Sequence, residues 1–339
     1  MRLIYQLVNN YGVAIVLFTI ITKILLFPIS YKQQKNTLRM QLIQPKLKKL
    51  QAKYKDKPQE LQQAQMQLYQ EEHVNPMSSC LPMFLQFFLL FGVLDVVYKP
   101  LTHILHYSKS VISKVVEIST GILGDSVAKQ YTGLRQELGV LKAFQDNPSA
   151  FSNVDTFDTS KVSDFMEHFT VFGVNLGETP TWHPEVWNTS AVILFCIPLL
   201  SGILQLIMTI YMQIMQKKRG TAPEQNMGCM NVMLYVMPLF SVWFAFQVSA
   251  GVGFYWACSS FFSLLQTIGL NLYFTPERGA KIIEKENKKM EARYAAGKQS
   301  FTERVMNQNA GAARVQETEK TKNMSNRELS SYNKQKIQE

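Results

Sequence analysis

The chain has 339 residues and a formal charge of +10, because 35 residues are Lys or Arg and 25 are Asp or Glu. Hydrophobic residues make up 47% and aromatic residues 12%, which excludes an intrinsically disordered chain. Four cysteines in this length exclude a disulfide scaffold. These averages also fit a basic soluble protein, so the order of the residues has to decide the class.

Five apolar stretches stand out along the chain, and each contains at most one charged residue. We predict membrane spans at residues 11–30, 78–98, 188–216, 228–247 and 250–274. A helix rises about 1.5 Å per residue, so about 20 residues cross a hydrocarbon core of about 30 Å. Buried core helices of a large soluble protein are the alternative, but five such stretches rarely occur together in one. The expected fold class is therefore an all-α polytopic membrane protein with five transmembrane helices.

The charges between the spans predict how the chain is oriented. Basic residues outnumber acidic ones by nine to four in 31–77, by three to one in 217–227 and by fourteen to nine in 275–339. The segment 99–187 instead has seven basic and ten acidic residues. By the positive-inside rule, the first three segments are cytoplasmic and 99–187 is external. We therefore expect a multi-pass plasma-membrane protein with its N-terminus outside and its C-terminus in the cytoplasm.

The segments outside the spans differ in expected structure. Residues 1–10 are predicted to be an external amphipathic lead-in, and 99–187 an external, mostly helical cap whose purpose the sequence does not reveal. Residues 31–77 have the apolar spacing of a cytoplasmic helical hairpin, with a turn near Pro58 and a helix start or kink at Pro45. This hairpin is either a solvated spacer or a mobile docking element near the lipid headgroups.

The C-terminal tail, 275–339, is basic and is predicted to be disordered after Gly297, where Asn, Gln, Ser and Lys dominate. A basic, flexible cytoplasmic tail binds anionic surfaces such as lipid headgroups or ribosomal RNA. The alternative is that its charge serves only topology and solubility.

An ionisable residue, Lys23, interrupts the first span about six residues from its cytoplasmic end. Such a residue costs roughly 2.5 to 3.5 kcal/mol at the centre of a span and is usually functional. Snorkelling of the Lys23 ammonium to the interface is the alternative. A lysine in a dry bundle would need an acid, and Asp95, the single acidic residue in the predicted spans, lies near the opposite membrane face. We therefore expect a water-filled groove that opens to the cytoplasm.

Polar side chains recur on single helix faces in these spans. Thr19 and Lys23 are four residues apart, and Ser259, Ser263 and Gln266 share a face of the last span. Polar stripes that face lipid are penalised, whereas stripes that face one another line a wet cavity. Hydrogen bonds between helices of a dry bundle are the simpler alternative.

Residues with catalytic or metal-ligating spacing are missing from the sequence. The five histidines show no paired ligand spacing, and no nucleotide-binding loop or nucleophile–base set occurs. The four cysteines all lie in or at the rim of the apolar stretches, where cysteine is a common apolar filler. We expect no enzyme activity, no cofactor and no metal.

Several motifs occur in one order along the chain. They are the run from Tyr11 to Lys23 followed by Phe27 and Pro28, Gln44-Pro45-Lys46, the run from Val74 to Pro82 with Gln86, Met237-Pro238, Gly251, Tyr255-Trp256, Ser263 and Gln266. In their order and separations these motifs resemble the YidC/Oxa family of membrane protein insertases, and the resemblance covers about 11–98 and 188–274. Within that family the chain resembles the short, Gram-positive-like form without the large external domain.

The resemblance implies five core helices around a hydrophilic groove that is closed outside and open to cytoplasm and lipid. It also implies a bacterial insertase and chaperone that acts on nascent membrane proteins, alone or beside the Sec translocon, and that hydrolyses no nucleotide. Lys23 stands where the family usually has an arginine. With the polar stripes, this gives the expected substrate-groove residues Lys23, Thr19, Thr22, Gln86, Gln205, Tyr255, Trp256, Ser259, Ser263 and Gln266.

The chain also departs from the family pattern at three places. Lys23 keeps the charge of the arginine but loses its planar five-donor fork. A Pro-Gly pair common before the fifth span is Ala250-Gly251 here, and a Ser-Asn pair is Ser259-Ser260.

The resemblance and the charges together suggest a mechanism. The groove charge would attract acidic or polar parts of a nascent chain, the hairpin 31–77 would receive the substrate, and the tail would hold the ribosome close. Two other readings remain. A small-solute transporter or channel would call for internal repeats and acid–base pairs near the membrane midplane. A membrane scaffold would act through 99–187 and would not need the polar stripes.

Overall fold

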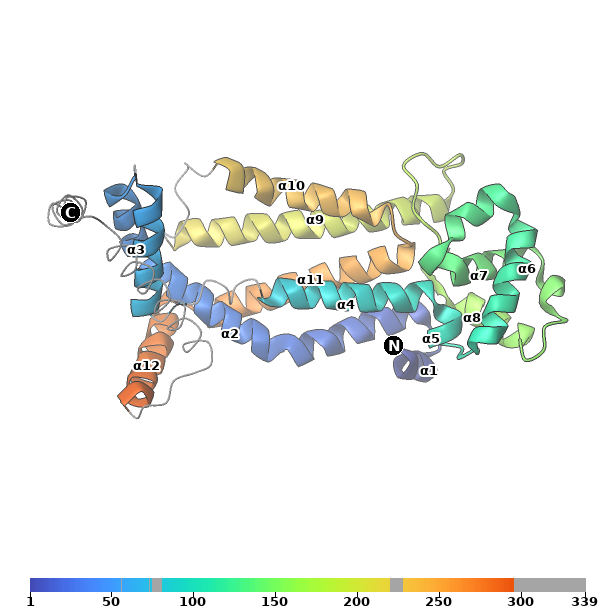
Figure 1. Ribbon diagram of the computed structural model, residues 1–339, viewed down its shortest axis with the longest axis horizontal. Coiled ribbons are helices and arrows are strands. Elements are labelled where there is room, and N and C mark those ends of the chain that lie inside the picture. The colour runs from blue at the N-terminus through green and yellow to red at the C-terminus, as the bar shows by residue number, and fades with distance from the viewer. Residues whose placement is uncertain (56, 73, 75–80, 220–227, 296–339) are drawn as a thin grey trace, which may run out of the picture. The chain divides into compact units, whose positions relative to one another are not determined.

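A computed structural model describes the chain except residues 56, 73, 75–80, 220–227 and 296–339 (Figure 1). The chain divides into two compact units, one made of Met1–Gln44 with Pro76–Thr275 and the other of Pro45–Asn75 with Pro276–Glu339. The expectation of an α-helical chain is confirmed for the described residues, apart from one short β-hairpin within 99–187 that the sequence did not predict.

The first unit contains the long apolar helices. They are α2 (Tyr11–Lys53, up to residue 44), α4 (Leu81–Tyr98), α9 (Thr189–Lys218), α10 (Gly228–Ala245) and α11 (Ala250–Tyr273). Helix α9 packs against both α10 and α11, and α11 also packs against α4 (Figure 1). Among the described residues, α2 and α9 are long and apolar enough to cross a membrane, and Phe84–Tyr98 of α4 is a shorter apolar helix. The count of five spans stays a prediction.

Local sequence signals explain where α9 begins and how closely it packs. The Asn188 side chain accepts a hydrogen bond from the Ala191 backbone N–H at 2.8 Å, which caps the first turn. Further along, a Cβ added at Gly202 would lie 2.1 Å from a Val242 methyl of α10. Glycine therefore sets the close approach of α9 and α10.

Helix α2 is longer than the first predicted span. It runs from Tyr11 to Lys53 as one helix, so a helix does not start at Pro45, one of the two possibilities that the sequence left open. The other possibility, a kink at Pro45, stays a prediction, because an interior proline removes one backbone hydrogen bond and crowds the preceding turn. The second unit contains its last turns, together with α3 (Pro58–Glu71) and α12 (Pro276–Ala295). Pro58 opens α3 at the position where a missing N–H costs least.

The first unit also contains the segment 99–187, which begins after α4. Its helices are α5 (Pro100–His103), α6 (Lys109–Ala128), η2 (Lys129–Tyr131), η3 (Gly133–Arg135), α7 (Gln136–Asp146), η4 (Pro148–Phe151) and α8 (Thr159–His168). Strands β1 (Thr170–Val171) and β2 (Val174–Asn175) follow and pair antiparallel. Phe172 and Gly173 connect them with positive φ angles of 52° and 78°, as a two-residue hairpin turn requires.

An aromatic cluster joins this segment to the N-terminal part of the chain. Helix α1 (Arg2–Val8) supplies Tyr5, α2 supplies Tyr11, and α8 with the residue after it supplies Phe165 and Phe169. The Tyr11 ring lies edge-on to Phe169 with centroids 4.8 Å apart, and both are fully buried. Burial and the nearby Asp164 raise the pKa of Tyr5 to about 12. The segment is thus packed on the start of α2 as well as on the end of α4.

Some predicted features lie outside the described residues. They are the tail from 296 onward, residues 220–227 of the loop 217–227, and residues 75–80 of the motif that runs from Val74 to Pro82. In the second unit, Leu47, Leu68 and Ile283 are buried, and Lys46 forms an ion pair with Glu72.

Candidate substrate groove

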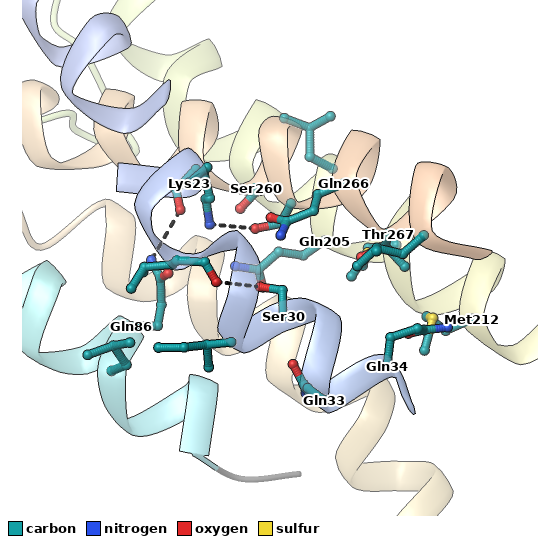
Figure 2. Close-up of a pocket in the computed structure, with 18 of the residues that line it drawn as sticks. Lys23, Ser30, Gln33, Gln34, Gln86, Gln205, Met212, Ser260, Gln266 and Thr267 are labelled. Atoms are coloured by element: carbon teal, nitrogen blue, oxygen red, sulfur yellow. Dashed lines mark hydrogen bonds between the residues drawn. The ribbon is translucent and has the colours of Figure 1, made fainter. Parts of the chain in front are cut away.

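A polar pocket of about 410 Å³ lies within the first unit, between α2, α4, α9 and α11 (Figure 2). Its polar lining consists of Lys23, Ser30, Gln33, Gln34, Thr37, Gln86, Gln205, Ser259, Ser260, Ser263, Gln266 and Thr267. Its other walls are Leu26, Ile29, Leu85, Leu204, Met208, Met212, Trp256 and Leu270. No acidic residue occurs among these described lining residues. The pocket therefore combines one cation with amides and hydroxyls on an aliphatic frame.

Lys23 of α2 lies inside this pocket. Its Nζ donates a hydrogen bond to Ser263 Oγ of α11 at 2.7 Å (Figure 2). The acid considered from the sequence as a partner, Asp95, is paired elsewhere, with Lys99 at 2.6 Å and His103 at 2.7 Å. Among the described residues the ammonium is therefore bound by a hydroxyl group and not by a carboxylate.

Another wall of the pocket is built by α4 and α11. Gln86 Nε2 donates to Ser259 Oγ at 3.1 Å, which joins the two helices. Tyr255 is only 2% exposed and does not line the pocket, whereas its neighbour Trp256 does. Tyr255 is therefore packed in the helix interface next to the pocket and not in its lining.

Two other predicted groove residues also lie outside the lining. Thr19 is buried, and its Oγ1 donates to the Ile15 carbonyl at 2.7 Å, while Thr22 Oγ1 donates to the Phe18 carbonyl at 2.7 Å. Both hydroxyls are satisfied within their own helix, as threonine hydroxyls in apolar helices often are. The structure thus brings seven of the ten predicted residues to the pocket and leaves Thr19, Thr22 and Tyr255 around it.

Gln33, Gln34 and Thr37 also line the pocket but were not predicted to do so, because the first span was expected to end at residue 30. In the structure α2 continues, and these residues extend the polar face of Lys23 and Ser30. Lys23, Ser30 and Thr37 are seven residues apart, about two helical turns, so they share one face. This seven-residue spacing was the signal in the sequence that could have identified the extended polar face.

One end of the pocket is held by polar contacts between α2, α9 and α11. Gln34 Nε2 donates to Asn271 Oδ1 at 3.0 Å, and both side chains are buried. Arg219, at the end of α9, donates to Gln41 Oε1 at 3.3 Å and to the Phe274 carbonyl at 3.1 Å. Its guanidinium satisfies a carbonyl at the C-terminus of α11, where a cation is favoured.

The other end of α11 is held by the segment 99–187. The Ala250 N–H donates to the Glu178 carbonyl at 2.6 Å and the Gly251 N–H donates to the Leu176 carbonyl at 2.8 Å. These two bonds satisfy backbone donors that a helix N-terminus otherwise leaves unpaired. Ala250 therefore supplies an N–H that a proline at this position would lack.

A buried carboxylate fixes the start of this segment on α7. Glu137 is 5% exposed and accepts hydrogen bonds from the Thr102 hydroxyl and, at 3.0 Å, from the Thr102 backbone N–H. Burial raises the pKa of Glu137, and the bonds from Thr102 oppose that rise. Arg135 connects this segment to the residues after α10, because its guanidinium donates a hydrogen bond to the Gln247 carbonyl.

Comparison with known proteins places this chain in a family. A sequence model described as 60Kd inner membrane protein matches residues 3–278. The membrane protein insertase YidC of Clostridium tetani is 48% identical over 84 residues, which are 25% of this chain and 38% of that protein. The YidC insertase of Helicobacter pylori is 45% identical over 95 residues, 28% of this chain and 17% of that protein.

The insertase YidC of Caulobacter vibrioides is 43% identical over 99 residues, 28% of this chain and 16% of that protein. The matched part thus spans less than two fifths of each of these relatives. The family model, by contrast, covers most of the chain, from near its N-terminus to the start of α12. The chain therefore belongs to the 60Kd inner membrane protein family, which is the YidC/Oxa family that its motifs resemble.

Proposed function

We propose that this chain is a membrane protein insertase and chaperone, which inserts and folds nascent membrane proteins through the pocket around Lys23 without hydrolysing a nucleotide. The observation that carries the proposal is a lysine that lies in a polar pocket between apolar helices and has no acidic partner among the described lining residues. A charge in such surroundings is costly and is kept where it serves a polar ligand.

The pocket suits a polypeptide segment that has to cross the hydrocarbon region. In the hydrocarbon region of a bilayer, each backbone group without a hydrogen-bond partner costs several kcal/mol. Polar walls supply replacement hydrogen bonds, and the ammonium attracts acidic side chains of the segment. The aliphatic and aromatic walls would let the apolar part of the substrate slide into lipid, so burial of apolar surface would drive release.

The arrangement we propose in the membrane has five spans, α2, α4, α9, α10 and α11, in a bacterial plasma membrane. The groove opens to the cytoplasm and is closed outside, with the N-terminus external and the C-terminus cytoplasmic. The charge excess of 31–77, 217–227 and 275–339 over 99–187 supports this orientation. The backbone bonds of 99–187 to the start of α11 support closure at the external end.

The partners we propose are nascent membrane proteins, the lipid bilayer, the Sec translocon and the ribosome. The fourteen basic and nine acidic residues of the tail 275–339 support the ribosome as a partner, because phosphate contacts dominate binding to ribosomal RNA. Salt-sensitive co-sedimentation of the full chain with ribosomes tests this partner.

Site-specific crosslinking tests the function as a whole. A photoreactive residue is placed at Ser260 or Gln86 in the pocket, and a matched one at Thr120 on the exposed face of α6. We expect a stalled nascent membrane protein to form adducts from the two pocket positions and not from position 120. A scaffold acting through 99–187 would give the reverse pattern. A transporter would give no adducts from any position and would show solute flux after reconstitution.

A further inference from the structure

The pocket contains an amide that lacks a partner. Gln266 Nε2 of α11 is buried and makes no hydrogen bond within the described part of the chain. Figure 2 shows Gln266, Gln205 and Lys23 directed into the same part of the pocket. A buried donor without an acceptor is unfavourable, and native proteins keep one mainly where a ligand or water completes it. The missing group must carry an acceptor.

The chemistry around Gln266 indicates which kind of acceptor. A carboxylate offers acceptors only, so a site built for it consists of donors. Each primary amide here offers donors on its nitrogen and an acceptor on its oxygen, and Gln205 lines the pocket beside Gln266. A peptide group has the same pairing, one N–H and one C=O.

We propose that Gln266, with Gln205, binds main-chain peptide groups of the substrate segment, so that the pocket takes an uncharged, extended polypeptide without regard to its side chains. This inference rests on the proposed insertase function and names the part of the substrate that is recognised. Lys23 then has a separate role, confined to substrates with acidic side chains.

The division of roles follows from the geometry. Ser263 is the partner of the Lys23 ammonium among the described residues, and an ammonium has three donors. A carboxylate of the substrate can therefore bind to the remaining donors of Lys23 while Gln266 stays available for a main-chain peptide group. The peptide groups of a segment repeat at every residue, so an amide can bind the next group as the chain moves past. Recognition of the main chain lets one pocket serve tails of different sequence.

The test uses the full chain in proteoliposomes and a single-span substrate with three alternative N-terminal tails of equal length. One tail is acidic, one has Asn and Gln in place of its acids, and one contains only Gly and Ala. Gln266→Met keeps the side-chain volume and removes both polar atoms. Gln247→Met, at an exposed glutamine outside the pocket, is the matched control.

We expect Gln266→Met to slow insertion of all three tails by about fivefold to tenfold, the effect of one lost hydrogen bond, and Gln247→Met to slow none. An unchanged rate for the Gly/Ala tail would overturn the inference, because that tail has only main-chain polar groups. A loss confined to the acidic tail would also overturn it, since it would make Gln266 part of a carboxylate site. If the parent chain inserts no tail at all, the proposed function fails instead.

Thermal unfolding of each variant separates lost binding from lost structure. Gln266 Nε2 makes no hydrogen bond within the described part of the chain that the substitution could break, so Gln266→Met should keep the parent midpoint or raise it. A lowered midpoint together with slower insertion of the Gly/Ala tail would assign the defect to folding and overturn the inference.

Discussion

Replacing Lys23 by methionine removes the pocket's charge with little damage to the fold. The substitution frees one hydroxyl, Ser263 Oγ, and leaves no acid of the described residues unpaired, because Asp95 has its own partners. A charge-assisted hydrogen bond contributes about 1.5 to 3 kcal/mol, so a middle value of about 2 kcal/mol corresponds to roughly a thirtyfold change in rate. We therefore expect Lys23→Met to slow insertion of a substrate with an acidic external tail about thirtyfold, and a neutral tail far less.

The assay compares acidic and neutral tails in proteoliposomes at low and high salt. Lys23→Arg keeps the charge and should insert the acidic tail within a few-fold of the parent rate, although the geometry of the contact changes. Raising the salt concentration should reduce the advantage of the acidic tail in the parent and have no such effect in Lys23→Met. Equal insertion of the acidic tail by Lys23→Met and the parent would refute the groove-charge reasoning, since a snorkelling lysine predicts that result.

Four further predictions concern the frame of the groove and the tail. Gly202→Ala should lower the free energy of unfolding by about 1 to 3 kcal/mol through overpacking against α10, whereas Gly269→Ala, which has open space, should not, as chemical denaturation can show. Ala250→Pro should cost about 1 kcal/mol by removing the N–H that holds α11, and faster amide exchange in the first turn would report the loosening. Because the pKa of Glu137 is raised in the folded state, that state binds the carboxyl proton more tightly than the unfolded state does. The parent should therefore gain stability relative to Glu137→Gln as pH falls from 7 toward 4.5. Thermal midpoints of the two proteins with equal pH dependence would contradict this prediction. Deleting 297–339 should weaken ribosome co-sedimentation at low salt and leave the unfolding midpoint unchanged; undiminished binding would leave the tail as a topology device.

The helices were predictable because apolar composition and period act over long stretches. The uncharged run that becomes α9 and the run that becomes α11 each exceed 20 residues, and their ends coincide with a capping Asn188 and with basic or polar residues. The two-residue strands β1 and β2 are too short for alternation to reveal them. Their turn depends on positive φ angles at Gly173 and Phe172. A positive φ angle at a phenylalanine cannot be predicted from the sequence.

The lining of the candidate groove was predictable at positions where a polar or charged residue interrupts an apolar run. Lys23 in an apolar run and Gln86 in another are conspicuous, and both line the pocket. Thr19 and Tyr255 were expected there too, but both are buried by packing and neither lines the pocket. Gln34 was missed because nearby basic residues marked the end of a span, while the helix itself continued. A span boundary and a helix boundary are set by different forces, by solvation and by backbone hydrogen bonding respectively.

The chemistry of the pocket lining has a consequence for the conditions in which the protein can work. Of the described residues that line the pocket, Lys23 is the one that can ionise; the rest of the polar lining is amide and hydroxyl. Amides and hydroxyls keep the same donors and acceptors across the pH and salt range of a living cell. For the proposed insertase, a change in acidity or ionic strength would thus alter only the charge-dependent share of insertion and leave the share that depends on amides and hydroxyls unchanged.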